Sequence, residues 1–302
     1  MNSAYAEQIL AAEQARLQSY LFLFSITFLY WDHILTLSDE LLYFWRRPVG
    51  ASTILFFLNR YFAALGNIAL AISLFSGDFT ESSCGSFHTF HELLLVATQV
   101  IICMLLAIRI YALYNCSKRI LALILSTGGI LSTLSLFAIF FDRSEGFLVG
   151  NGGLGLGCET ELSFIPSIQE AAAWEALFLY DSMLFVMTLH KAYKTHRELR
   201  PLRIPLMDII LRDGSLYFGV MAFANAVNIS TFYYPLPYAR GMLSSFASSM
   251  SVTMMSRLMF NLHKVADKGL FSSGPYSSDP TSYCSGSQSE NLTVIATVSE
   301  AS

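Results

Sequence analysis

Seven long apolar runs, separated by short polar segments, dominate the pattern of hydrophobic and polar positions along the chain. A bilayer core about 30 Å thick needs roughly 20 mostly apolar residues in each spanning helix. The runs cover residues 17–37, 52–75, 88–113, 120–141, 168–190, 207–232 and 239–262. The fifth and sixth are the weakest, because Asp181, Arg212 and Asp213 interrupt them. The pattern predicts an all-α integral membrane bundle of seven transmembrane helices.

The composition is that of a membrane protein. Apolar residues make up 54% of the 302 residues and charged residues only 13%, which is not typical of a soluble domain. The net charge of −4 gives no reason to expect nucleic acid, so the partner that the composition indicates is the lipid bilayer. Glu7 and Glu13 precede Arg16, so the N-terminus lacks the basic start of a signal peptide. We expect the first apolar run to be retained as a helix.

Basic residues between the runs predict the orientation, because short cytoplasmic loops carry an excess of lysine and arginine. Basic clusters follow the first, third, fifth and seventh runs: Arg46, Arg47, Lys118, Arg119, Lys191, Lys194, Arg197, Arg200, Arg203, Lys264 and Lys268. The opposite side carries Arg16, Arg143 and Arg240. This alternation predicts an N-terminus outside and a C-terminus in the cytoplasm.

The same pattern divides the chain into three parts. Residues 1–16 are expected to form a short extracellular N-terminus, and residues 17–265 the transmembrane domain. Residues 266–302 are rich in serine and glycine, so we expect a disordered cytoplasmic tail.

The predicted outer loops contain Cys84 and Cys158 and a glycine-rich run at 150–157. The two cysteines lie on the oxidising side, which favours a disulfide between them. Two free cysteines are the alternative, since sequence gives no geometry. The glycine run is interpreted as a flexible linker, because a phosphate cradle needs a strand before it and a helix after it.

Ionisable and polar groups inside the apolar runs are costly and indicate pairing or function. They predict an intramembrane polar layer of Asp32, His33, Asn59, Arg60, Arg109, Asp181, Asp213 and Arg257. One interpretation is a switch that changes ion-pair partners between states. The other, which we favour, is static pairing combined with arginines that extend to the interface.

The first two runs give the most specific prediction. The short loop between them makes the two helices antiparallel neighbours. Asp32 and Arg60 differ in depth by about 5 Å, which an arginine side chain can cross. We predict an Asp32–Arg60 ion pair, with His33, Thr36 and Asn59 nearby to supply hydrogen bonds. The rival arrangement has Arg60 reaching the interface alone while Asp32 faces cytoplasmic water.

Candidate chemistry is sparse. His88 and His91 share a helix face and could bind zinc with a third ligand, but no further outer histidine supplies it, so interfacial hydrogen bonding is the default. The sequence has no Walker pattern, no lysine in the seventh run for a retinal Schiff base, and no membrane-embedded cluster of histidines and acids. We expect no enzymatic activity, no catalytic residues, no cofactor and no metal.

Several segments resemble a known family. Tyr30–Leu37, followed by Glu40, Trp45–Arg47 and Leu55–Tyr61, is similar to a fungal membrane domain of unknown function, DUF6533. Similarity to full-length members continues in four later segments: Arg109–Tyr114, Tyr180-Asp181, Arg212–Gly214 and Ser256–Met259. The resemblance implies a fungal multi-pass membrane protein whose residues 17–75 form the DUF6533-like pair of helices. It implies no activity.

Three functions stay open at this point. A receptor-like sensor fits the outer N-terminus, the serine-rich tail and the basic loop Lys191 to Arg203, which is suited to a cytoplasmic protein partner. A transporter or channel would use the intramembrane charges, and a membrane scaffold would need no ligand. We favour the sensor, with an unidentified ligand, in the plasma membrane; other endomembranes are the alternative location.

Overall fold

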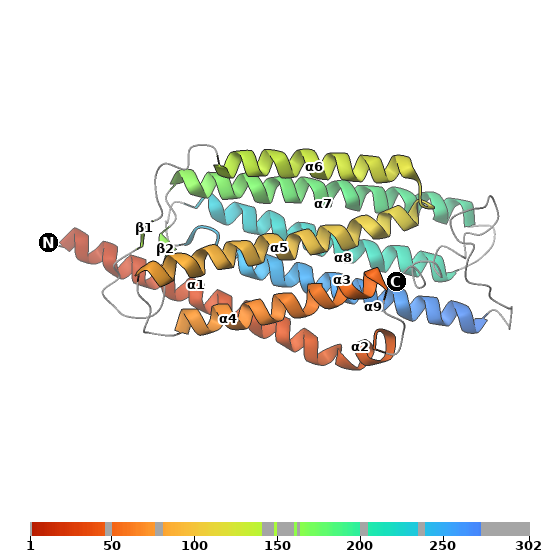
Figure 1. Cartoon of the computed structure of the whole chain (residues 1–302), viewed down its shortest axis with the longest axis horizontal. Helices are drawn as coiled ribbons and strands as arrows, with labels where there is room; N and C mark the ends of the chain where they lie inside the picture. Colours follow the sequence, from red (N-terminus) through yellow and green to blue (C-terminus); the bar gives the residue numbers. More distant parts are fainter. Residues whose placement is uncertain are drawn as a thin grey trace.

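A computed structural model of the chain describes residues 2–45, 50–75, 81–140, 148–149, 160–161, 164–199, 205–234 and 239–272. Most of these residues are helical (Figure 1). The helices are α1 (Asn2–Leu35), α2 (Leu37–Tyr43), α3 (Ala51–Phe57), the π-helix η1 (Leu58–Phe62), α4 (Ala63–Phe75), α5 (Glu81–Leu113), α6 (Lys118–Phe140), α7 (Phe164–Leu199), α8 (Pro205–Phe232) and α9 (Ser244–Ser272). Two short strands, β1 (Leu148–Val149) and β2 (Thr160–Glu161), pair antiparallel.

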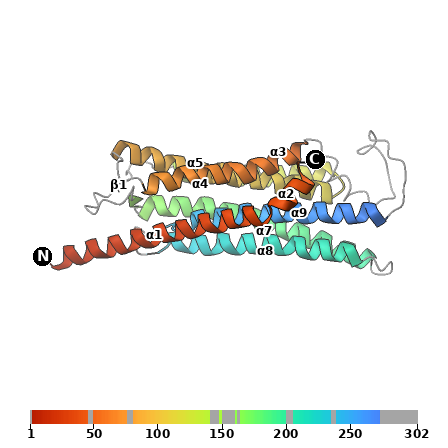
Figure 2. The same cartoon turned by 90° about the horizontal axis from the view of Figure 1, so that it is seen from below.

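The helices form one elongated bundle of rods that lie side by side (Figures 1 and 2). α3, η1 and α4 follow one another without a break and make a single rod. Successive rods run in opposite directions along the long axis, so α1, α5, α7 and α9 all end where α2 lies. We call this the basic end, because Lys118, Lys191 and Lys264 lie near it, and we call the opposite end, where α1 begins, the distal end.

Length and hydropathy qualify four helical segments as membrane spans: Ser52–Ser73, Gly85–Leu113, Lys118–Phe137 and Phe164–Lys191. A fifth is the bent pair Ala12–Leu35 and Leu37–Tyr43, and α8 contributes a shorter apolar stretch, Leu216–Phe232. The all-helical fold and four or five of the seven predicted spans are therefore supported. Within the described ranges, α9 does not meet the criterion, because its sequence contains many serines.

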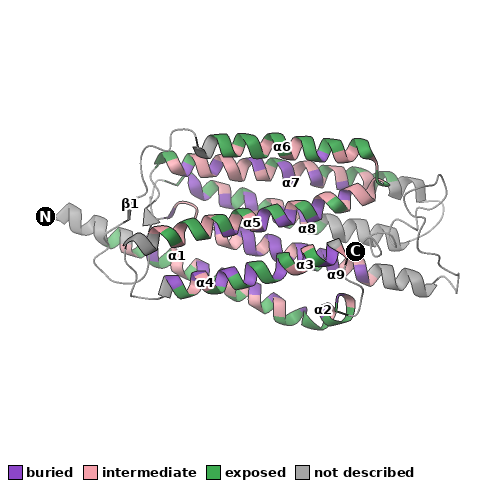
Figure 3. Ribbon diagram, viewed as in Figure 1, coloured by how far each residue is buried: buried purple, intermediate pink, exposed green. Residues whose placement is uncertain are grey.

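Burial explains the difference between the polar α9 and the apolar α6. α9 contacts α1, α2, η1, α5 and α8, and its hydroxyl groups point into these interfaces. α6 packs on α7 and α5, and 6% of its span is buried (Figure 3). A helix surrounded by others can carry polar side chains that bond to its neighbours, whereas a peripheral helix in lipid must be apolar.

The hydrophobic core lies between α3, α5, α7, α8 and α9, where its largest fully buried members include Phe56, Leu106, Leu184 and Met255. At the basic end, Phe44 stacks on Phe56 with ring centroids 3.8 Å apart. Phe260 of α9 contacts both rings edge-on. Aromatic pairs add about 0.5–1.5 kcal/mol beyond burial, so this cluster fixes the residues after α2 against α3 and α9.

Both ends of the predicted transmembrane domain extend further as helix. α1 begins at Asn2, so residues 2–16, expected as a short outer segment, belong to the first helix. α9 continues to Ser272, so residues 266–272, expected in a disordered tail, are helical instead. The rest of the predicted tail, residues 273–302, and the glycine run at 150–157 lie outside the described residues.

Candidate functional site

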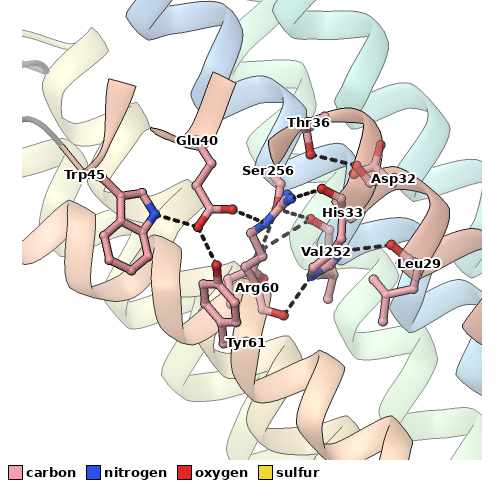
Figure 4. A network of polar contacts seen from close by, with 11 residues as sticks. Leu29, Asp32, His33, Thr36, Glu40, Trp45, Arg60, Tyr61, Val252 and Ser256 are labelled. Atoms are coloured by element: carbon pink, nitrogen blue, oxygen red, sulfur yellow. Dashed lines mark hydrogen bonds and ion pairs between the residues drawn. The ribbon is translucent and has the colours of Figure 1, made fainter. Parts of the chain in front are cut away.

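A break at Thr36 shapes the polar site at the basic end. α1 stops at Leu35 and α2 starts at Leu37, with axes 49° apart. The Thr36 hydroxyl and backbone N–H both donate to the carbonyl of Asp32, at 2.7 and 3.0 Å. Threonine bonds of this kind to the preceding turn bend helices. The bend redirects α2 so that Glu40, in the middle of this short helix, points into the bundle (Figure 4).

Glu40 forms a fully buried ion pair with Arg60 of η1. Arg60 Nε lies 2.8 Å from Glu40 Oε2, and the two residues are 1% and 0% exposed. The other carboxylate oxygen accepts hydrogen bonds from the Tyr61 hydroxyl at 2.6 Å and from Trp45 Nε1 at 3.0 Å. A buried ion pair is tolerated when additional hydrogen bonds satisfy its remaining polar atoms, and this carboxylate meets that condition.

The guanidinium of Arg60 also joins η1 to α1 and α9. Its Nη2 donates to the backbone carbonyl of His33 at 2.8 Å, and its central carbon lies 5.6 Å from the centre of the Phe260 ring. The His33 ring faces two carbonyls, that of Leu29 at 2.7 Å from Nδ1 and that of Arg60 at 3.1 Å from Nε2. A neutral imidazole donates to one of them. The contacts fix His33 and Arg60 against each other.

The π-helix explains how Asn59 and Arg60 are both buried. Neighbouring side chains on an α-helix point about 100° apart, and the wider turn of a π-helix changes that spacing. Asn59 is 1% exposed and donates to the Val252 carbonyl and the Ser256 hydroxyl of α9, both at 3.3 Å. Single π-turns are frequent at functional sites, which makes η1 part of the candidate site.

Two further ion pairs connect the first two helices to α9. Arg257 Nε donates to Asp32 Oδ1 at 2.6 Å, with side chains 43% and 3% exposed. Lys264 Nζ lies 2.7 Å from Asp39 Oδ2, and both side chains are partly exposed. Asp32 is therefore neutralised from the surface side of the bundle, whereas Glu40 is neutralised from within.

The predicted Asp32–Arg60 ion pair is wrong. Asp32 lies close enough to Arg60 for an electrostatic interaction, but its carboxylate binds Arg257, and Arg60 binds Glu40. The rival arrangement, in which Arg60 reaches the interface, is also wrong, because Arg60 is buried. The sequence interpretation placed Glu40 in a loop beyond the first helix and so missed the bend at Thr36.

A second buried polar group lies farther from the basic end. Asp181 of α7 is 5% exposed, and its Oδ2 accepts a 2.9 Å hydrogen bond from Asn225 Nδ2 of α8, which is fully buried. Asp181 Oδ1 and Asn225 Oδ1 have no hydrogen-bond partner among the described residues. Sequence reasoning selected Asp181 but missed Asn225. Asn225 and Asn228, three residues apart in an apolar run, were the available signal.

The structure therefore does not bring the predicted polar layer together as one unit. Across the described side chains, neither Asp181 nor Arg109 hydrogen-bonds or ion-pairs with the Glu40–Arg60 network. Nε and Nη1 of Arg109 have no partner within that part of the chain. The side chain of Asp213 lies outside the described residues.

The remaining sequence candidates lie toward the distal end. His88 Nδ1 is 3.4 Å from Glu92 Oε1, and His91 Nε2 is 2.9 Å from the Ser245 hydroxyl. No group of three or more histidine, cysteine, aspartate or glutamate side chains is placed to hold a metal in the described ranges. Cys158 and the side chain of Cys84 fall outside those ranges, so their disulfide stays a prediction.

These features define a multi-pass helical membrane protein with a charged, paired cluster at one end of its bundle. Residues 20–65 match the sequence model of a family of unknown function (DUF6533), which confirms the domain expected from the sequence. The match runs from α1 into α4 and contains Asp32, Glu40 and Arg60. No curated protein and no solved structure matches the chain.

Proposed function

We propose that the chain crosses the bilayer seven times. The alternating rods support this count, because each returns the chain to the opposite end of the bundle. α8 and α9 have 28 and 29 residues, and at 1.5 Å per residue their lengths of about 42–44 Å exceed the roughly 30 Å hydrocarbon core. Asn225, Asn228 and Thr231 of α8 and most of the described hydroxyl groups of α9 are buried against neighbouring helices, which makes the low hydropathy of α9 compatible with a span.

We further propose that the N-terminus is outside and the basic end cytoplasmic, at the plasma membrane. Lysines at the ends of α6, α7 and α9 support this orientation through the positive-inside rule. The distal end then faces the oxidising side, where a Cys84–Cys158 disulfide can form. A C-terminal tag protected from protease on sealed cells is the expected result, and cleavage on intact cells would reverse the orientation.

For activity, we propose a receptor-like sensor, and the position of α9 is the observation that carries this proposal. α9 contacts helices on several sides of the bundle, so a movement of these helices relative to one another would also displace α9. At the basic end, α9 holds Asp39 through the partly exposed Lys264, a pair worth about 1 kcal/mol or less. α9 can release this contact at small cost. We place the cytoplasmic partner on the basic segment Lys191 to Arg203, which the sequence predicted as a loop and which belongs to α7 as far as Leu199.

Distance measurements between α7 and α9 test the sensor. Spin labels are placed at Tyr193→Cys and Asn261→Cys after replacement of the native cysteines. We expect two distance populations, whose ratio shifts by about fivefold when Lys264→Ala removes the ion pair, since 1 kcal/mol corresponds to that factor. Lys118→Ala on α6, the matched control, should leave the ratio unchanged. A single population that neither substitution moves would contradict the sensor.

A transporter or channel is the second candidate function, and Asp181 favours it. A buried acid without an ion-pair partner in the described part of the chain is typical of ion and proton pathways in membranes. Sodium or proton flux in liposomes that Asp181→Asn abolishes would favour transport. Absence of flux together with the α9 population shift favours the sensor. A ligand-free scaffold would show neither signal.

A further inference from the structure

Asp181 carries a buried carboxyl group whose only partner among the described residues is the neutral amide of Asn225, so no positive charge balances an ionised Asp181. Asp181 and Asn225 are buried, and a single hydrogen bond of 2.9 Å connects them. That bond uses Asp181 Oδ2 and the nitrogen of the Asn225 amide, and it leaves one oxygen of each side chain without a partner. The two unpartnered oxygens belong to adjacent helices, one to a carboxyl and one to an amide, and both are the kind of hard oxygen ligand that small cations take.

The chain does not supply this charge from its described residues. Arg60 is bound to Glu40, Arg257 to Asp32 and Lys264 to Asp39. Arg109 forms no ion pair with Asp181 in the same part of the chain, although both side chains have unpartnered polar atoms. An isolated carboxylate in a low-dielectric interior is too costly to remain unpaired, so Asp181 requires a positive charge that none of the described side chains provides.

The surroundings of the pair are apolar toward the basic end and polar toward the distal end. One turn toward the basic end, Leu184 and Met221 are fully buried. In the other direction, Asn228 follows on the same face of α8 and accepts a 3.2 Å hydrogen bond from Ser244. Gln99 of α5, also buried, carries an unpartnered Nε2. The polar groups near the pair therefore lie on its distal side.

The ionisable groups that face Asp181 are weak acids. Cys103 of α5 and the adjacent Tyr180 lie within electrostatic range of its carboxyl group. Neither can neutralise a carboxylate, because the charged form of each is negative. Asn225 on α8 is neutral. The required charge is therefore a single one, since one carboxylate carries one negative charge.

We propose that Asp181 and Asn225 bind a monovalent cation, a proton or a sodium ion, in the interior of the bundle. A sodium ion would take Asp181 Oδ1 and Asn225 Oδ1 as hard oxygen ligands. A proton would bond to Asp181 Oδ1 and turn it into a hydrogen-bond donor. Both occupants supply the same charge to the same oxygen. The site does not depend on the sensor function, because binding requires neither a partner nor movement of α9.

The experiment uses the purified full-length protein in detergent, with Asp181→Asn and, as matched control, Asp32→Asn. Melting temperature is measured while sodium chloride replaces choline chloride at constant ionic strength. The infrared band of a protonated carboxyl group is recorded on the same samples. A sodium site raises the melting temperature of wild type and of Asp32→Asn with each tenfold increase in sodium, but not that of Asp181→Asn.

A proton site gives a different result in the same samples. Melting is then independent of sodium, and wild type and Asp32→Asn show a protonated carboxyl band that Asp181→Asn lacks. Asn225→Ala should weaken the sodium response about tenfold or shift the carboxyl band. The proposal is overturned if wild type shows neither signal, or if Asp181→Asn keeps it. Failure of Asp181→Asn to fold while Asp32→Asn folds also counts against it, because an open cation site does not need its own acid to fold.

Discussion

Two buried acids in this bundle have opposite environments. Glu40 faces a fully buried arginine and accepts two further hydrogen bonds from Tyr61 and Trp45. Asp181 accepts one hydrogen bond from the Asn225 amide and has no ion-pair partner within the described residues. Both are almost inaccessible to solvent. The comparison shows that burial of an acid does not by itself identify its role, which depends on whether the chain supplies the opposite charge.

The paired acid is most simply a structural element. The Glu40–Arg60 pair connects the bend after α1 to η1, and both elements lie in the segment that matches DUF6533. Asp181 is the better candidate for a functional residue, because a cation from outside the protein can supply the positive charge that it lacks. Substitutions at the two acids and at their partners separate these two roles.

The largest effect is expected for Arg60→Gln. It leaves Glu40 buried without its counter-charge, which should lower the free energy of unfolding by about 3–5 kcal/mol. The double variant Glu40→Gln, Arg60→Gln removes both charges and should recover part of this loss. Unfolding in detergent measures both. A double variant whose loss equals the sum of the two single losses would show that the residues are not coupled.

Asp32→Asn should cost less, about 1–3 kcal/mol, which is the range for a hydrogen bond to a charged group. Asp32 is buried, but its partner Arg257 is partly exposed and can be solvated when the acid is neutral. Thermal unfolding of Asp32→Asn and Arg60→Gln under the same conditions tests whether Asp32→Asn loses less stability. A loss as large as that of Arg60→Gln would mean that Asp32, rather than Glu40, neutralises Arg60.

Tyr61→Phe removes one of the two hydrogen bonds that Glu40 accepts from aromatic side chains. We expect a loss of about 1–2 kcal/mol, since Trp45 and Arg60 still hold the carboxylate. Tyr20→Phe on the exposed face of α1 is the control and should change stability by less than about 0.5 kcal/mol. Equal changes in stability for the two substitutions would show that the hydrogen bond from Tyr61 to Glu40 does not contribute to stability.

The smallest effect is expected for Lys264→Ala. The Asp39–Lys264 pair is partly exposed at the basic end, so its contribution should be about 0–1 kcal/mol and should fall as salt is added. Unfolding at low and high ionic strength measures it. A loss above about 2 kcal/mol that persists in high salt would show that this pair is buried in solution.

The sequence predicted the helices well, because apolar length determines where a membrane helix lies. The predicted runs 52–75, 88–113 and 120–141 correspond to α3 through α4, α5 and α6. It underestimated the N-terminal end of α1 and the C-terminal end of α9, because polar residues beyond a bilayer can remain helical without any apolar signal.

The pairing of the charges was less accessible from sequence. Asp32, Thr36 and Glu40 recur every four residues, which would place them on one face of a continuous helix. The break at Thr36 and the π-turn of η1 change the directions of Glu40, Asn59 and Arg60. Neither irregularity has a reliable pattern in the sequence. The ion-pair partners of Asp32, Glu40 and Arg60 could therefore not be derived from the depth of each residue in the membrane alone.

The comparison of the two acids is tested most directly by measuring Glu40→Gln and Asp181→Asn together. Both variants replace a buried carboxyl group with an amide of the same shape, and their free energies of unfolding are determined in the same detergent and buffer. The account predicts that Glu40→Gln loses about 3–5 kcal/mol, because Arg60 is left as an unpaired buried charge. Asp181→Asn should lose less than about 1 kcal/mol, or gain stability, because it removes a buried charge that no described residue neutralises. Similar losses for the two variants would contradict the account.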